Sequence, residues 1–155
     1  MILSKYINLY NRLLYLCILT IPFFIHANVS VITTSGLSTA IKSDDAYVWK
    51  NIPYAKPPIG DLRWKAPKEI PSSNEVLSGK GSGCIQEPSR YAGLEGRGVV
   101  GSEDCLYLDI YQPEKNSNDK LPVMFWIHGG GNTTGTKDYY NFSKLSSSKG
   151  IVVVV

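Results

Sequence analysis

Three consecutive glycines, Gly129, Gly130 and Gly131, follow His128 and an apolar run at residues 123–127. Glycine loses more backbone entropy on folding than any other residue, so a triplet beside a strand needs a reason. Without Cβ atoms, successive backbone N–H groups can converge on one spot and admit a negatively charged oxygen. Such a cluster can stabilise the oxyanion of the tetrahedral intermediate in acyl transfer.

A glycine turn can have two other uses, of which the first is phosphate binding. A phosphate-binding turn needs Gly-x-x-x-x-Gly-Lys-Ser/Thr or Gly-x-Gly-x-x-Gly, and the segment from Gly131 to Gly135 supplies neither. The other alternative is a tight turn with no chemical role. We favour the oxyanion interpretation, because a His-Gly-Gly-Gly turn has a known role in ester hydrolases.

The segments before this turn predict mainly strands and ordered loops. We expect strands at 29–34 and 46–49, and a third at 105–111, where apolar and polar residues alternate. The continuous apolar run at 123–127 predicts a strand buried on both faces. Proline, serine and glycine dominate the expected loops, which lie at 52–60, 72–83 and 84–104.

The segment after the turn predicts a short helix followed by a strand. The helix is expected from about 139 to 148, with Asp138 as its cap and Gly150 as its end. A further strand begins at Ile151. Strand, glycine turn, helix and strand in this order open an α/β sheet.

Composition indicates a globular protein with an N-terminal leader. The 155 residues are 43% apolar and 19% charged, and the net charge of +3 is too small to indicate a nucleic-acid partner. Lys5 and Arg12 precede an apolar run at 13–25, which is shorter than the roughly 20 residues of a membrane-spanning helix. We interpret 1–27 as a signal peptide and 28–155 as the exported part. An uncleaved membrane anchor is the alternative.

Two cysteines, Cys84 and Cys105, remain once the leader with Cys17 is removed. In an exported chain such a pair favours a disulfide, and two buried free thiols are the alternative. With only two cysteines, one remaining histidine and no Cys-x-x-Cys, a zinc site is not expected. No other metal and no cofactor is implied.

Three segments, in order, resemble type-B carboxylesterases, the group that includes cholinesterases. Residues 121–131 (LPVMFWIHGGG) resemble the oxyanion segment of that family. Residues 102–109 (SEDCLYLD) resemble its second signature, and residues 51–64 (NIPYAKPPIGDLRW) its N-terminal motif. The chain departs from the usual residues at Asn51 (usually Gly), Trp64 (usually Phe) and Asp109 (usually Asn).

The resemblance implies a fold and a set of residue roles. The fold is the N-terminal portion of an α/β-hydrolase, with a mostly parallel central sheet preceded by short antiparallel strands. Gly130 and Gly131 would donate their N–H groups to the oxyanion. His128 and Gly129 would support that turn, and His128 would not be the catalytic base. The family's first disulfide would join Cys84 to Cys105, and Arg63 would pair with Glu103.

The catalytic triad itself is missing from this sequence. No serine stands in Gly-x-Ser-x-Gly, and the nearest approach, at 36–40, precedes the expected central sheet. The only histidine after the leader is His128. The loop between Cys84 and Cys105 also lacks the tryptophan that stacks on choline in cholinesterases, which favours a general carboxylesterase.

We therefore interpret the chain as the N-terminal part of a secreted or periplasmic serine ester hydrolase. Its substrate would be a small carboxylic ester, and no nucleic acid or lasting membrane anchor is expected. The β-branched run at 151–155 needs partner strands, which suggests a longer domain, and this chain alone is expected to hydrolyse no ester. The alternatives are a non-catalytic extracellular binding relative, and a truncated gene product whose 151–155 strand is unpaired.

Overall fold

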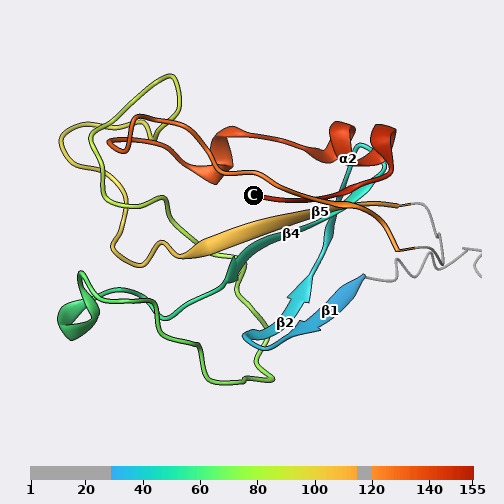
Figure 1. Cartoon of the computed structure of the whole chain (residues 1–155), viewed down its shortest axis with the longest axis horizontal. Coiled ribbons are helices and arrows are strands. Elements are labelled where there is room, and N and C mark those ends of the chain that lie inside the picture. Colours follow the sequence, from blue (N-terminus) through green and yellow to red (C-terminus); the bar gives the residue numbers. More distant parts are fainter. Residues whose placement is uncertain (1–28, 115–119) are drawn as a thin grey trace, which may run out of the picture.

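Among the residues that the structure describes, seven strands form two sheets. The computed structural model describes residues 29–114 and 120–155 (Figure 1), so the predicted leader lies outside the described residues. A two-stranded antiparallel sheet joins β1 (Ser30–Thr33) to β2 (Gly36–Thr39). The second sheet has the order β3-β4-β5-β7-β6, with β3 (Ile41–Ser43), β4 (Ala46–Pro53), β5 (Tyr107–Pro113), β6 (Val123–Phe125) and β7 (Val152–Val154).

The predicted α/β architecture is confirmed. Strands β3, β4, β5 and β7 pair antiparallel in that order, and β6 pairs with β7 in parallel. Between β6 and β7 the chain forms the short 3₁₀ helix η2 (Lys137–Tyr139) and helix α2 (Ser143–Lys149). The five-stranded sheet is therefore mixed, and its parallel part begins at the strands that flank the glycine turn. A second 3₁₀ helix, η1 (Gly60–Leu62), lies in the loop after β4.

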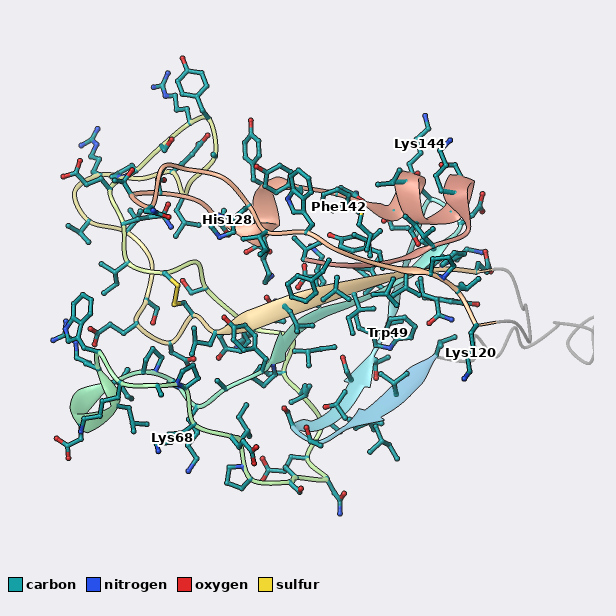
Figure 2. The ribbon with its side chains drawn as sticks, viewed as in Figure 1. Trp49, Lys68, Lys120, His128, Phe142 and Lys144 are labelled. Atoms are coloured by element: carbon teal, nitrogen blue, oxygen red, sulfur yellow. A yellow bond between two sulfur atoms is a disulfide. The ribbon has the colours of Figure 1, made fainter. Side chains whose placement is uncertain are left out.

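The core is a row of side chains that crosses four strands. Register pairs Val48 with Tyr111, Tyr111 with Val153, and Val153 with Met124. Val48, Tyr111 and Val153 form the buried cluster, and Met124 and Phe142 pack against it. Figure 2 shows Phe142 directed toward the sheet and Lys144 directed away from it. The row thus attaches α2 to the strands that carry the glycine turn.

Strand β4 is longer than predicted. The prolines after Ile52 predict a loop, yet β4 runs to Pro53, which pairs with Tyr107. The pairing shifts between Trp49 and Ile52, where Asn51 adopts a φ of 56°. Such a bulge absorbs an extra residue and lets the strand continue, so the predicted loop start at 52 was wrong.

The last strands differ in how far they match the sequence analysis. Strand β7 has the partner strands that the 151–155 run was expected to need, because it pairs with β5 and β6, and Val153 is 0% exposed. Strand β6 is not buried on both faces, because Val123 and Phe125 are 66% and 67% exposed. Strand β6 is the edge strand of this sheet and has β7 as its one neighbour among the described strands.

Helix α2 begins at Ser143, four residues after the predicted start at 139. Asp138 is not its cap, because Thr136 caps the separate helix η2 and accepts from the Asp138 N–H. Tyr140 and Phe142 both pack against Trp126, with ring centroids 5.6 and 5.5 Å away. Residues two apart share a side in extended backbone but not in an α-helix, so this contact delays the helix. Its end at Gly150, with φ 65°, is as predicted.

No helix within 29–114 and 120–155 has the length and apolar character needed to cross a membrane.

Buried tyrosines should make the fold sensitive to alkaline pH. Burial raises the pKa of Tyr111 to about 12, and the Asp109 carboxylate adds to the rise. The unfolded tyrosine has a pKa of about 10, so the stabilisation is complete below pH 10 and falls as pH rises toward 12. We expect the urea midpoint to decrease over that range, and less steeply in Tyr111→Phe. Identical slopes for the two proteins would contradict the assignment.

Candidate active site

The glycine turn closes on its own carbonyl group. The carbonyl oxygen of Gly130 accepts from the backbone N–H groups of Thr133 (3.1 Å) and Thr134 (3.2 Å), and from the Thr133 hydroxyl (3.0 Å). The Gly130 carbonyl oxygen is thus hydrogen-bonded within the turn. The N–H groups of Gly130 and Gly131 donate to no oxygen within the described part of the chain. Both donors are therefore available to a ligand.

Glycine is required at two points of this loop for steric reasons. At Gly130, where φ is 139°, a Cβ would overlap the carbonyl oxygen of Thr134. At Gly135, where φ is 138°, a Cβ would overlap the His128 ring and the Gly129 carbonyl oxygen. Gly131 has a left-handed φ of 62° but open space around its Cβ position. The two ends of the loop thus lie in direct backbone contact.

His128 lies on the exposed side of this loop. Its Nδ1 is 3.1 Å from the Gly129 carbonyl oxygen, and its ring covers Gly135. It forms no ion pair with any described carboxylate. A histidine that acts as a triad base is oriented by an acidic partner, and the described residues give His128 none.

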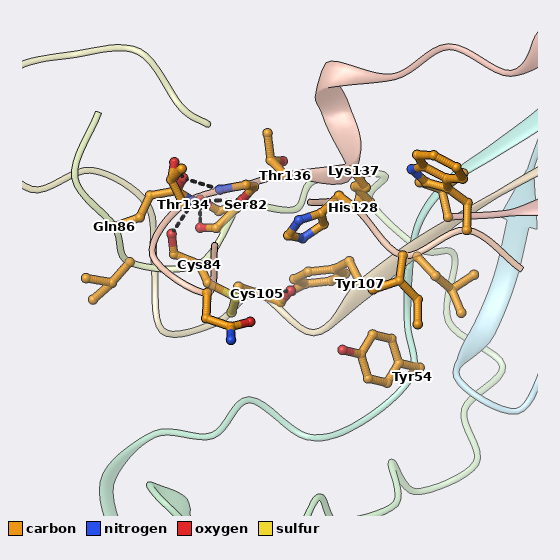
Figure 3. A pocket seen from close by; sticks show the side chains of 18 of the residues that line it. Tyr54, Ser82, Cys84, Gln86, Cys105, Tyr107, His128, Thr134, Thr136 and Lys137 are labelled. Atoms are coloured by element: carbon orange, nitrogen blue, oxygen red, sulfur yellow. Dashed lines mark hydrogen bonds between the residues drawn. A yellow bond between two sulfur atoms is a disulfide. The ribbon is translucent and has the colours of Figure 1, made fainter. Parts of the chain in front are cut away.

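A cavity of about 700 Å³ lies beside the loop. Figure 3 shows His128, Tyr107 and Tyr54 facing it from one side and the disulfide-loop residues Cys84 and Gln86 from the other. Trp126 and Val155 add further apolar surface. The cavity therefore combines an aromatic wall with the polar residues 132–137 that follow the glycine triplet, a combination that suits a small organic ligand. The described residues contain no group of three or more side chains able to hold a metal ion.

The disulfide loop has the contacts that the sequence predicts. Cys84 and Cys105 are joined by a disulfide, with a Cα–Cα distance of 4.9 Å. The Arg63 Nε lies 2.7 Å from the Glu103 Oε1, which confirms the predicted ion pair. Both contacts fix the chain just before strand β5.

Comparison with known proteins gives the family. The model of the carboxylesterase family matches residues 26–155. The chain belongs to the carboxylesterase family. It is 38% identical over 128 residues to the para-nitrobenzyl esterase of Bacillus subtilis, which covers 80% of this chain and 26% of that protein. It is 37% identical over 131 residues to the fumonisin B1 esterase of Sphingopyxis macrogoltabida, covering 79% of this chain and 23% of that protein.

Solved structures agree with this family fold. A thermophilic PNB esterase superposes with a TM-score of 0.70 at 36% identity, over 83% of this chain and 27% of that structure. A carboxylesterase of Geobacillus stearothermophilus gives 0.65 at 31% identity, over 81% and 25%. The chain spans about a quarter of the length of these carboxylesterases.

The sequence analysis of this carboxylesterase chain did not identify the hydrogen bonds of the Gln86 side chain. Its side chain is 8% exposed and bridges the disulfide loop to the end of the glycine loop. No local pattern marks it, because its partners at 134 and 135 lie 48 and 49 residues away.

A buried ion pair behind the loop was also missed. The Lys137 ammonium lies 2.9 Å from the Asp109 carboxylate, and the two side chains are 9% and 1% exposed. The same Asp109 oxygen accepts from the backbone N–H of Asn51 in the β4 bulge (2.8 Å). The usual asparagine at 109 is replaced by an acid, and that departure was the available signal for a cationic partner.

The disulfide should contribute measurably to stability. It closes a loop of 21 residues, and the loop-entropy model gives about 3 kcal/mol for a loop of that size. We expect the Cys84→Ser/Cys105→Ser variant to lose about that free energy of unfolding in urea. Reduction of the parent chain with dithiothreitol is the control and should give the same loss. A loss below about 1 kcal/mol in both would contradict the loop-entropy account.

Proposed function

We propose that this chain provides the oxyanion-binding part of an exported serine carboxylic-ester hydrolase. The observation that carries the proposal is the pair of free N–H groups on Gly130 and Gly131, in a turn closed on the Gly130 carbonyl. Donors fixed before the substrate arrives stabilise the developing oxyanion without reorganisation, and one such donor typically contributes about 3 kcal/mol. Family membership favours an ester as the substrate.

The reaction would be divided between this chain and residues outside it. A serine outside the 155 residues, activated by a histidine and an acid also outside them, would attack the ester carbonyl and release the alcohol, and water would then hydrolyse the acyl-enzyme to the carboxylic acid. The Gly130 and Gly131 N–H groups would bind the oxyanion in both steps. His128 and Gly129 would hold the turn, and the aromatic side of the cavity would hold the apolar part of a small ester.

Export is the remaining part of the proposal. The basic residues and short apolar run of 1–27 favour cleavage after Ala27 and a secreted or periplasmic product. The chain is also 44% identical over 93 residues to venom carboxylesterase-6 of Apis mellifera. N-terminal sequencing of secreted protein should begin at Asn28, whereas an intact leader would contradict cleavage.

A hybrid enzyme tests the function. The aligned 128 residues of the Bacillus subtilis para-nitrobenzyl esterase are replaced by the matching part of this chain, and hydrolysis of p-nitrophenyl acetate is measured. We expect turnover by the hybrid and none by the 155-residue chain alone. A folded hybrid without turnover would contradict an oxyanion role. Serine-dependent turnover by the chain alone would contradict the division of the site.

A further inference from the structure

The side-chain amide of Gln86 is fully used in hydrogen bonds. Its Oε1 accepts from the Gly135 N–H (2.8 Å) and the Thr134 hydroxyl (2.6 Å). Its Nε2 donates to the carbonyl oxygens of Gly135 and Cys84, both at 2.9 Å (Figure 3). Two donors and two acceptor positions are the whole capacity of a glutamine amide, so its orientation is uniquely determined.

The bonds to Gly135 have a particular form. One side chain accepts from the N–H and donates to the C=O of the same residue, as the backbone of a neighbouring strand would. Thr134 and Gly135 have no strand partner within the described residues, since β6 ends at Phe125. The Gln86 side chain therefore makes, at Gly135, the two hydrogen bonds that a neighbouring strand would otherwise make.

Gly135 and its neighbour Thr134 are in direct contact with the glycine turn that carries the two N–H groups. The Thr134 carbonyl oxygen lies where a Gly130 Cβ would be, and Gly135 lies against the Gly129 carbonyl oxygen. The Gly130 carbonyl also accepts from the Thr134 N–H. Residues 129–130 and 134–135 thus pack backbone to backbone, and the His128 ring also lies against Gly135.

Gln86 is itself paired within the disulfide loop. Its backbone N–H and C=O pair with those of Val100 at 2.9 Å each. It stands two residues after Cys84, which is bonded to Cys105, two residues before β5 begins. The amide therefore connects the glycine loop to a cross-linked segment.

We propose that Gln86 is a positioning residue that sets the direction of the Gly130 and Gly131 N–H groups. This inference rests on the proposed function, because those groups matter for catalysis only if they bind an oxyanion. Gln86 touches no reacting atom and acts through Gly135.

The sharpest substitution is Gln86→Glu, which keeps the size of the side chain and removes both Nε2 donors. A carboxylate then faces the carbonyl oxygens of Gly135 and Cys84, and this repulsion should push the loop end away. Gln112→Glu makes the same chemical change on the exposed side of β5 and is the matched control. Thr134→Val removes only the 2.6 Å bond and is a milder second variant if Gln86→Glu unfolds.

The first measurement uses the full 155-residue chain labelled with ¹⁵N-glycine. We expect Gln86→Glu, and to a lesser degree Thr134→Val, to shift the amide resonances of Gly130 and Gly131 together with that of Gly135. Gln112→Glu should leave all three unchanged. A shift confined to Gly135 in both loop variants would overturn the proposal, because the contact would then not reach the donors.

The second measurement uses the hybrid enzyme. Misplaced oxyanion donors weaken binding of the transition state more than of the substrate, so Gln86→Glu should lower kcat at least about tenfold with KM nearly unchanged. An unchanged kcat in an active hybrid would overturn the positioning role. A folded but inactive parent hybrid would instead refute the proposed function, and the glycine resonances would still decide whether Gln86 positions the loop.

Discussion

Replacing Lys137 with methionine is expected to lower the free energy of unfolding by about 3–5 kcal/mol, the usual cost of breaking a buried ion pair. The change leaves the Asp109 carboxylate, 1% exposed, with the Asn51 N–H as its hydrogen-bond donor and no cation. A buried charge without a counter-ion must either lose its charge or pull water into the core. Lys137 also bonds to Asp138 (2.8 Å), but that carboxylate is partly exposed and loses less.

Urea unfolding of a small set of variants tests this expectation. The double variant Asp109→Asn/Lys137→Met removes both charges and should recover most of the loss, because the pair as a unit contributes little net stability. The exposed pair Lys42–Glu114, at 2.7 Å, is the control, and Lys42→Met should cost no more than about 1 kcal/mol. Equal losses in Lys42→Met and Lys137→Met would show that the Asp109 site is hydrated.

Local pattern was enough to predict the framework of the fold. Alternation along β5, the apolar run of β6 and the glycine at 150 identify two strands and a helix end correctly. Each expectation that failed depended on a distant neighbour, although the long-range disulfide and the Arg63–Glu103 ion pair were predicted correctly from the family resemblance. The β4 bulge needs the Asp109 carboxylate, the delayed helix needs the Trp126 ring, and the exposure of β6 follows from its place in the strand order.

In the candidate site too, the residues with a local sequence pattern were predictable and those that depend on distant contacts were not. Gly130 is recognisable from sequence because a glycine triplet after a strand has few explanations, and its contact with Thr134 supplies the steric one. The two long-range contacts, from Gln86 and Lys137, have no such local mark. Asp109 was visible as a departure from the family pattern, but the identity of its cation depends on how β5 packs behind the glycine loop.

Replacing Gly130 with alanine should have the largest effect on the proposed activity. The new Cβ would overlap the Thr134 carbonyl oxygen, and the backbone there adopts a φ of 139°, which is a conformation L-residues rarely adopt. Thr134 cannot move aside freely, because its hydroxyl is bonded to Gln86 and its N–H to the Gly130 carbonyl. The turn must therefore open, and its donors lose their common direction.

In the hybrid enzyme we expect Gly130→Ala to lower kcat about 10²- to 10³-fold, the effect of losing one oxyanion donor. Gly131→Ala is the matched variant. Its φ of 62° makes alanine strained by roughly 1–2 kcal/mol, but nothing lies within 4 Å of the new Cβ, so the turn can keep its shape. A larger kcat loss in Gly130→Ala than in Gly131→Ala would therefore reflect the altered shape of the turn, because both variants add a methyl group. Equal losses would mean that the turn tolerates either methyl, and that its closure on the Gly130 carbonyl does not control the donors.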